Sequence, residues 1–168
     1  MAQRVCKYFL LFLMAMGGLC PTLCAKGTGL PLPRFASLRA NEVNLRCGPG
    51  LAYPIEWVYT QKYLPVKIIS EYNVWRQIQC PEGTRGWVHQ SMLSGRKMGL
   101  VHAPQGVVFL RRTARATSAP IAKVRHHALG QLKTCTQKAC QMTFGGIKGW
   151  LPRSYVWGAP LPAKSPSP

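Results

Sequence analysis

The sequence predicts an all-β protein in which two small β-barrels follow one another along the chain. Three observations predict this fold class: short apolar runs separated by turn residues, a second half that repeats the first, and no sustained helical periodicity after residue 25. Short, evenly spaced strands are typical of small barrels, whereas an amphipathic helix places apolar residues every three or four positions. We therefore expect one module at 34–96 and another at 98–158.

The strands of the first module are indicated by apolar residues at alternate positions between turn signals. Val66 and Ile68, for example, lie two apart and share one face of an extended strand. Glycine, proline and asparagine favour the backbone conformations of tight turns. We expect strands at 40–46, 64–72, 74–80 and 84–89, separated by turns at 47–50, at Asn73 and at 81–83.

An internal repeat defines the two modules. The matched segments are 86–95 with 149–158 at an offset of 63, Gln77-Ile78 with Gln141-Met142 at 64, Pro54-Ile55 with Pro120-Ile121 and Val58 with Val124 at 66, and Asn44-Leu45-Arg46 with Phe109-Leu110-Arg111. A recurring segment set of this kind indicates that one structural unit occurs twice. The changing offset requires only small differences in loop length between the two copies.

The N-terminus has the pattern of an export signal. Basic residues precede an apolar run at 8–16, and Leu23-Cys24-Ala25 places a small residue before a cleavage point at Lys26. The run is short for a bilayer span. We therefore expect a signal peptide at 1–25 and a periplasmic or secreted protein. The alternatives are an uncleaved anchor and lipidation at Cys20 or Cys24.

Two segments outside the modules are rich in glycine, proline or serine. Residues 26–33 are expected to be a linker, flexible at first and then stiffened by proline. Residues 159–168 are expected to be a disordered Pro/Ser tail, because they carry too little apolar surface to fold.

The positive charge belongs mostly to the second half of the chain. The sequence has 22 basic and 4 acidic residues, and the 12 basic residues from Arg96 to Pro168 face no acidic residue at all. Such a field attracts nucleic acid, anionic lipid or anionic envelope polymers, although a basic surface can also serve solubility alone. The candidate anion-docking residues are Arg111, Arg112, Arg115, Lys123 and Arg125.

Four cysteines follow the predicted signal peptide, as expected for disulfides in an oxidising compartment. Cys135 and Cys140 flank a turn of four residues, so they face each other across a hairpin within disulfide range. Cys47 and Cys80 are the remaining pair, and we expect them to bridge the long loop to the barrel. A four-cysteine zinc site is the rival interpretation, but this spacing is not typical of zinc ligands.

No residue pattern indicates catalysis, a cofactor or a metal site. The four histidines and the mature cysteines lack the local context of a Cys–His nucleophile. The glutamates have no recognisable glycosidase context, and a small barrel has no deep cleft. We therefore predict that the protein is not an enzyme and needs no cofactor.

Several of these segments together resemble the bacterial SH3-like (SH3b) domain family. The opening strand is Asn44-Leu45-Arg46-Cys47-Gly48-Pro49-Gly50, the closing segment is Gly86-Trp87-Val88, and Tyr53-Pro54, Trp75-Arg76 and Trp157-Gly158 complete the set. The resemblance covers both modules. It implies two tandem SH3-like barrels, each five-stranded and partly open, after the signal segment. It also implies that a long loop, here 47–63, flanks a binding groove.

The resemblance implies that aromatic side chains line that groove. Pro152 and Tyr155 match the proline and tyrosine of the closing motif in eukaryotic SH3 domains, where His89 and Met92 stand in the first module. The candidate groove residues are Tyr53, Trp75, Trp87, Trp150, Pro152 and Tyr155. Bacterial family members bind cell-wall peptides or serve as targeting modules beside wall hydrolases.

Four functions remain open from the sequence. The first is an exported, non-catalytic binding or scaffold protein whose partner is a cell-wall peptide, a glycan or an envelope protein. The second is a basic protein that binds nucleic acid or another polyanion, which a small barrel with aromatic residues can do but which the export signal disfavours. The third is a purely structural interaction protein, and the fourth is an unrecognised hydrolase.

Overall fold

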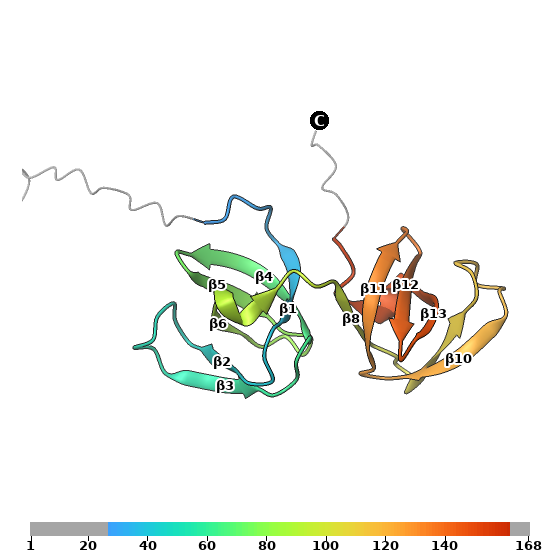
Figure 1. Ribbon diagram of the computed structural model, residues 1–168, viewed down its shortest axis with the longest axis horizontal. Coiled ribbons are helices and arrows are strands. Elements are labelled where there is room, and N and C mark those ends of the chain that lie inside the picture. The colour runs from blue at the N-terminus through green and yellow to red at the C-terminus, as the bar shows by residue number, and fades with distance from the viewer. Residues whose placement is uncertain (1–26, 162–168) are drawn as a thin grey trace, which may run out of the picture.

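The computed structural model describes residues 27–161, and it places them in two all-β modules that lie side by side (Figure 1). Each module is a seven-stranded antiparallel sheet. The predicted signal peptide at 1–25 and residues 162–168 of the predicted tail lie outside the described residues. The all-β prediction is confirmed.

The first sheet has the strand order β3-β2-β6-β5-β4-β1-β7. A short 3-10 turn, η1 (Gln90–Met92), precedes its last strand. The strands are β1 (Arg34–Leu38), β2 (Val43–Arg46), β3 (Ile55–Tyr59), β4 (Pro65–Tyr72), β5 (Trp75–Gln79), β6 (Arg85–His89) and β7 (Leu93–Ser94).

The second sheet repeats this order as β10-β9-β13-β12-β11-β8-β14. The 3-10 turn η2 (Arg153–Tyr155) stands in the place of η1. The strands are β8 (Met98–Val101), β9 (Val107–Arg111), β10 (Pro120–Arg125), β11 (Leu129–Cys135), β12 (Ala139–Phe144), β13 (Ile147–Pro152) and β14 (Val156–Trp157).

The strand registers correct one part of the repeat alignment. Val43 lies opposite Tyr59, and the equivalent Val108 lies opposite Val124. The match of Val58 with Val124 is therefore wrong by one residue, and the offset between β3 and β10 is 65. Cross-strand pairing fixes which residue turns toward the core, and two isolated valines in the sequence cannot reveal it.

Three strands of the first module fall outside the segments predicted to be strands, and one of them is the two-residue β7. β3 lies inside the stretch expected to be a long loop at 47–63, and β1 lies before the first expected strand. Four of the five β3 residues are exposed, and only Tyr59 is buried. Because both faces of most of β3 meet solvent, its residues show no apolar alternation.

Each module has its own hydrophobic core. Alternate residues of each strand turn inward, as the two-residue period of an extended chain requires. The first core includes the fully buried Leu38, Val43, Leu45, Val66, Ile78 and Val88, and the second includes Val101, Leu110, Met142 and Leu151. Leu100 of β8 packs with the first core, so the two cores meet at the start of the second module.

The glycine of the Gly-Trp repeat is required by a close approach between strands. A Cβ atom on Gly86 would lie 2.5 Å from Leu45 Cγ and 2.9 Å from the Arg46 carbonyl oxygen. A Cβ atom on Gly149 would meet Leu110 and Arg111 at the same two distances. Because a side chain would not fit at either position, glycine allows β6 to lie against β2 in the first module and β13 to lie against β9 in the second.

Trp157 joins the two modules. Its indole Nε1 donates a hydrogen bond to the Pro65 carbonyl oxygen at 2.9 Å, and its ring meets Phe35 edge-on with centroids 5.4 Å apart. The Lys67 ammonium lies 4.8 Å from the Trp157 ring centroid. A residue of the second module thus packs on β1 and β4 of the first, and the two modules have a direct interface.

Candidate functional site

The predicted groove residues of the first module lie on two neighbouring strands and a loop. Trp75 of β5 is paired with His89 of β6, and Trp87 of β6 is paired with Gln77, so both tryptophans share the sheet face opposite to Ile78. Trp75 is only 9% exposed and meets the His89 ring edge-on at 5.6 Å. Tyr53, by contrast, is exposed and lies in the loop after β2.

The predicted groove residues of the second module occupy the equivalent place. Trp150 and Pro152 lie two apart on β13, opposite Gln141 and Ala139 of β12. Tyr155 belongs to η2 and packs partly buried against the second core. The structure thus divides the six predicted groove residues between two similar surfaces, one on each module.

The arginine of the opening-strand motif holds the adjacent loop in both modules. Arg46 Nη1 donates hydrogen bonds to the carbonyl oxygens of Leu51 at 3.2 Å and Tyr53 at 2.7 Å. Arg111 Nη1 donates to the Ser118 carbonyl oxygen at 2.6 Å. Arg111, predicted as an anion-docking residue, therefore directs part of its guanidinium group to the protein backbone.

A groove of about 940 Å³ lies at the junction of the modules, and the sequence did not indicate it. Its first-module wall includes Trp57, Tyr59 and Glu82, and its second-module wall includes His102, His127 and Trp157. Trp57 is 58% exposed and stands on the edge strand β3. Because the walls lie up to 100 residues apart in the sequence, only the packing of the modules creates this groove.

The polar groups around this groove are paired on one wall and clustered on the other. The Tyr59 hydroxyl donates a hydrogen bond to a Glu82 carboxylate oxygen, and the pKa of Tyr59 is raised by burial and by the neighbouring Cys80 and Glu82. On the second module, the His126 ring centroid lies 5.0 Å from that of His102 and 3.8 Å from that of His127.

The centre of this histidine cluster is held in one orientation. His126 Nδ1 accepts a hydrogen bond from the Ala103 amide at 3.0 Å. Burial and the two neighbouring imidazoles lower the pKa of His126. The lowered pKa favours the neutral form of His126. The exposed His102 and His127 can offer nitrogen atoms to a ligand in the groove.

The predicted linker at 26–33 is fixed at one point to the first module. The Thr28 amide donates to Glu71 Oε2 at 2.5 Å, and the Thr28 hydroxyl donates to Glu71 Oε1 at 2.8 Å. Glu71 also pairs with Arg34 and, at 3.2 Å, with Arg76. Within the predicted linker, Thr28 is therefore held in place by a carboxylate that binds its backbone and its hydroxyl.

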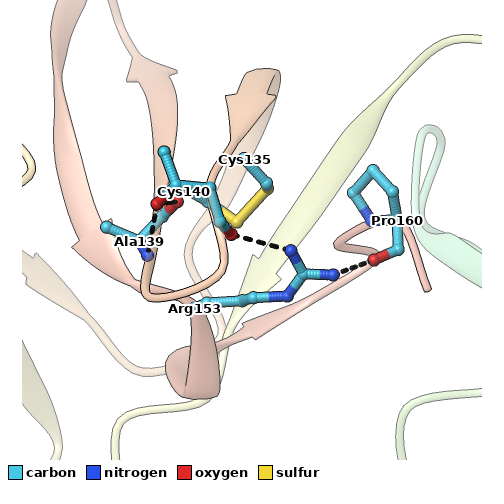
Figure 2. Close-up of a disulfide and its surroundings, with 6 residues drawn as sticks. Cys135, Ala139, Cys140, Arg153 and Pro160 are labelled. Carbon is cyan, nitrogen blue, oxygen red and sulfur yellow. Dashed lines mark hydrogen bonds between the residues drawn. A yellow bond between two sulfur atoms is a disulfide. The ribbon is translucent and has the colours of Figure 1, made fainter. Parts of the chain in front are cut away.

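The disulfide between Cys135 and Cys140 is confirmed, and the two residues are direct cross-strand partners in the β11–β12 hairpin. Figure 2 shows Arg153 beside this hairpin, where Nη1 donates to the Thr136 carbonyl oxygen at 2.8 Å and Nη2 donates to the Pro160 carbonyl oxygen. Arg153 thus ties the end of the module to the disulfide-closed turn.

The predicted bridge between Cys47 and Cys80 is wrong, because both thiols are free. Cys80 follows β5 and lies fully buried in the first core, whereas Cys47 is exposed at the start of the loop after β2. Burial raises the pKa of Cys80 to about 12, with the Glu82 charge adding to the rise and the Tyr59 hydrogen bond opposing it. Pairing by elimination failed because cysteine can serve as a small core residue.

Residues 27–161 contain neither a metal-binding cluster nor a membrane-spanning helix. Within them, no three or more His, Cys, Asp or Glu side chains gather in a way that could hold a metal ion. The same residues contain no helix of the length and hydropathy needed to cross a membrane.

Comparison with known proteins finds a family match for the first module. Residues 39–95 match the family model described as bacterial SH3 domain. No curated protein matches the chain.

Solved structures that the comparison matches to this chain include NlpC1 from Trichomonas vaginalis, with 11% identity, a TM-score of 0.34, and coverage of 79% of this chain and 48% of that one. An NlpC/P60 family protein from Bacillus cereus has 12% identity, a TM-score of 0.32, and coverage of 74% and 57%. The chain spans about half the length of these proteins.

Proposed function

We propose that this chain, whose residues 39–95 form a bacterial SH3 domain, is a non-catalytic binding protein of the bacterial cell envelope. The family match supports a role at the cell wall. The Cys135–Cys140 disulfide supports an oxidising compartment, since such bonds persist outside the cytosol. The predicted signal peptide at 1–25 agrees with this location.

The junction groove is the observation on which the proposal depends. An exposed tryptophan beside imidazoles, a glutamine and a serine offers a stacking surface together with hydrogen-bonding groups. Cell-wall peptides and their attached sugars present apolar faces, amides and carboxylates, which this combination can bind. The groove therefore replaces the separate aromatic surfaces around Trp75 and Trp150 as the preferred ligand site.

A pull-down on insoluble peptidoglycan tests the proposal with residues 26–168, which contain both sheets. Trp57→Ala should reduce the affinity about tenfold, as expected for loss of an aromatic anchor at about 1.4 kcal/mol. The matched control is Ile55→Ala, since Ile55 lies on the same strand, is exposed, and does not line the groove. Equal binding by Trp57→Ala and the wild type would refute the role of the groove.

The basic second module supports a competing function as a polyanion-binding protein. Duplex DNA provides the probe, because binding driven by charge falls steeply as the salt concentration rises. Peptidoglycan binding that persists at a salt concentration where DNA binding is lost favours the envelope function. Release of soluble wall fragments by the pure protein would contradict its non-catalytic character.

A further inference from the structure

The strands β9 and β10 form a ribbon with an unusual exposed face. Lys123 lies opposite Phe109, and Arg125 lies opposite Val107, so cationic and apolar side chains alternate across the pair. Phe109 is 43% exposed and Val107 is 47% exposed. The Lys123 ammonium lies 5.7 Å from the centroid of the Phe109 ring. The intervening Val108, Leu110 and Val124 are buried, which fixes the other four side chains on the outer face.

The equivalent face of the first module lacks this composition. With the offset of 65 that the registers establish, the counterparts of Val107, Phe109, Lys123 and Arg125 are Glu42, Asn44, Val58 and Thr60. Both modules have the same fold, so the fold does not require the apolar and basic residues. Their presence in the second module therefore has to be explained by something other than the fold.

The loop next to the ribbon adds exposed basic residues on an ordered backbone. Arg112 and Arg115 are exposed in the turn between β9 and β10. The Arg112 amide donates to the Ala119 carbonyl oxygen at 3.1 Å, and the Ser118 amide donates to the Arg115 carbonyl oxygen at 3.0 Å. Because the chain has no acidic residue after Glu82, no carboxylate of the second module neutralises this surface.

We propose that this β9–β10 face docks the protein on the surface of an anionic phospholipid bilayer. Basic residues near such a surface are attracted to its headgroups, and exposed apolar side chains enter the boundary between headgroups and acyl chains. Lys123 suits this position, since a lysine beside an apolar ring can lay its aliphatic stem along apolar surface while its ammonium reaches the headgroups. A soluble polyanion would engage the cations and leave Val107 and Phe109 in water.

The location of the face is compatible with the junction groove. β10 lies at the end of the second module farthest from the first module (Figure 1). A protein docked through β9 and β10 therefore keeps the groove between the modules open. The membrane proposal goes beyond the binding of wall material and does not depend on it.

Co-sedimentation with vesicles tests the proposal, using residues 26–168 to avoid the apolar leader. Vesicles of phosphatidylcholine alone are compared with vesicles that also contain phosphatidylglycerol, at near-physiological salt. We expect binding only to the anionic vesicles, and about a tenfold loss of affinity for the double variant Lys123→Gln, Arg125→Gln. Phe109→Asn, which introduces the residue found at the equivalent position of the first module, should lower the affinity for anionic vesicles about fivefold.

A matched charge control separates this face from the general positive field. Lys133→Gln with Lys138→Gln removes the same charge from β11 and the turn after it, and should change binding less than about twofold. An equal loss from both double variants, or wild-type binding by Phe109→Asn, would overturn the proposal in favour of nonspecific charge. A urea unfolding midpoint equal to that of the wild type would show that Phe109→Asn is folded.

Discussion

At the scale of single residues, Glu71 organises one end of the first module. Its carboxylate side chain is 5% exposed, and it accepts hydrogen bonds from Thr28 while pairing with Arg34 and Arg76. Burial by itself would raise the pKa of Glu71. The hydrogen bonds and the positive charges outweigh burial and lower the pKa from 4.5 to about 2. The sequence indicated none of this, because the partners lie on three separate segments.

The first prediction concerns the pH dependence that follows from this pKa. Since folding lowers the pKa of Glu71, its carboxylate stabilises the fold above about pH 4.5, and that contribution is lost as the pH falls toward 2. Glu71→Gln should lower the free energy of unfolding at pH 7 by about 2 kcal/mol. This loss is smaller than the loss expected for a deeply buried ion pair, because solvent near the surface screens the charges.

Urea unfolding between pH 7 and pH 2 measures both effects. The control is Glu42→Gln, since Glu42 is an exposed acid of the same module. The difference between wild type and Glu71→Gln should shrink as the pH falls. A difference that stays constant down to pH 2 would contradict the assigned ion pairs.

The second prediction concerns the two free thiols. Cys47 is exposed, whereas Cys80 is fully buried with a pKa raised to about 12. Ellman's reagent at pH 8 should therefore modify one thiol in native residues 26–168 and two after denaturation, because a buried thiol stays protonated and inaccessible. Cys47→Ser should abolish native labelling. Absence of labelling in denatured wild-type protein would restore the bridge predicted from the sequence.

At the scale of elements, the close approach of β6 to its neighbour β2 explains why Gly-Trp occurs in both modules. Gly86 sits where a Cβ atom would collide with Leu45 and with the backbone of Arg46. The sequence repeat revealed that this dipeptide is structural, but only the packed strands identify the glycine as the reason. The tryptophan that follows each glycine lies on the opposite face.

The third prediction is that Gly86→Ala destabilises the first module by about 2 kcal/mol, because the backbone oxygen of Arg46 cannot move without breaking strand pairing. Gly95→Ala is the control, since no atom lies within 4 Å of its Cβ position. It should change the free energy of unfolding by less than about 0.5 kcal/mol. Chemical denaturation measures both variants, and equal effects would contradict the close approach of the strands.

At the scale of the whole molecule, the interface around Trp157 brings two similar modules together around one groove. The repeat indicated that the modules exist, yet it could not indicate whether they touch. At the repeat offset of 63, the counterpart of Trp157 is Ser94, which follows Leu93. Nothing in this part of the first repeat indicates that Trp157 is an interface residue. The groove at the junction depends on this one packing arrangement.

The fourth prediction is that Trp157→Ala loosens the junction. Removing the hydrogen bond to Pro65 and the contact with Phe35 should loosen the connection between β7 and β8, where Arg96 and Lys97 are already exposed. Limited trypsin digestion there should be about tenfold faster, because cleavage follows the population of locally open states. The cleavage rate of Trp157→Phe, which keeps an aromatic ring, should lie between the rates of the wild type and Trp157→Ala. An unchanged cleavage rate would mean that the modules are held together elsewhere.

The sequence by itself determined the features that depend on neighbours along the chain. Alternating residues such as Val66 and Ile68 indicated strands, a four-residue turn placed Cys135 beside Cys140, and the repeat separated the modules. Tertiary structure alone decided that Cys80 enters a core, that β3 forms an exposed edge, and that Trp57 faces His102 and His127 across a groove. Local geometry follows from a few adjacent residues, whereas these contacts result from packing between distant segments, and no short stretch of sequence encodes that packing.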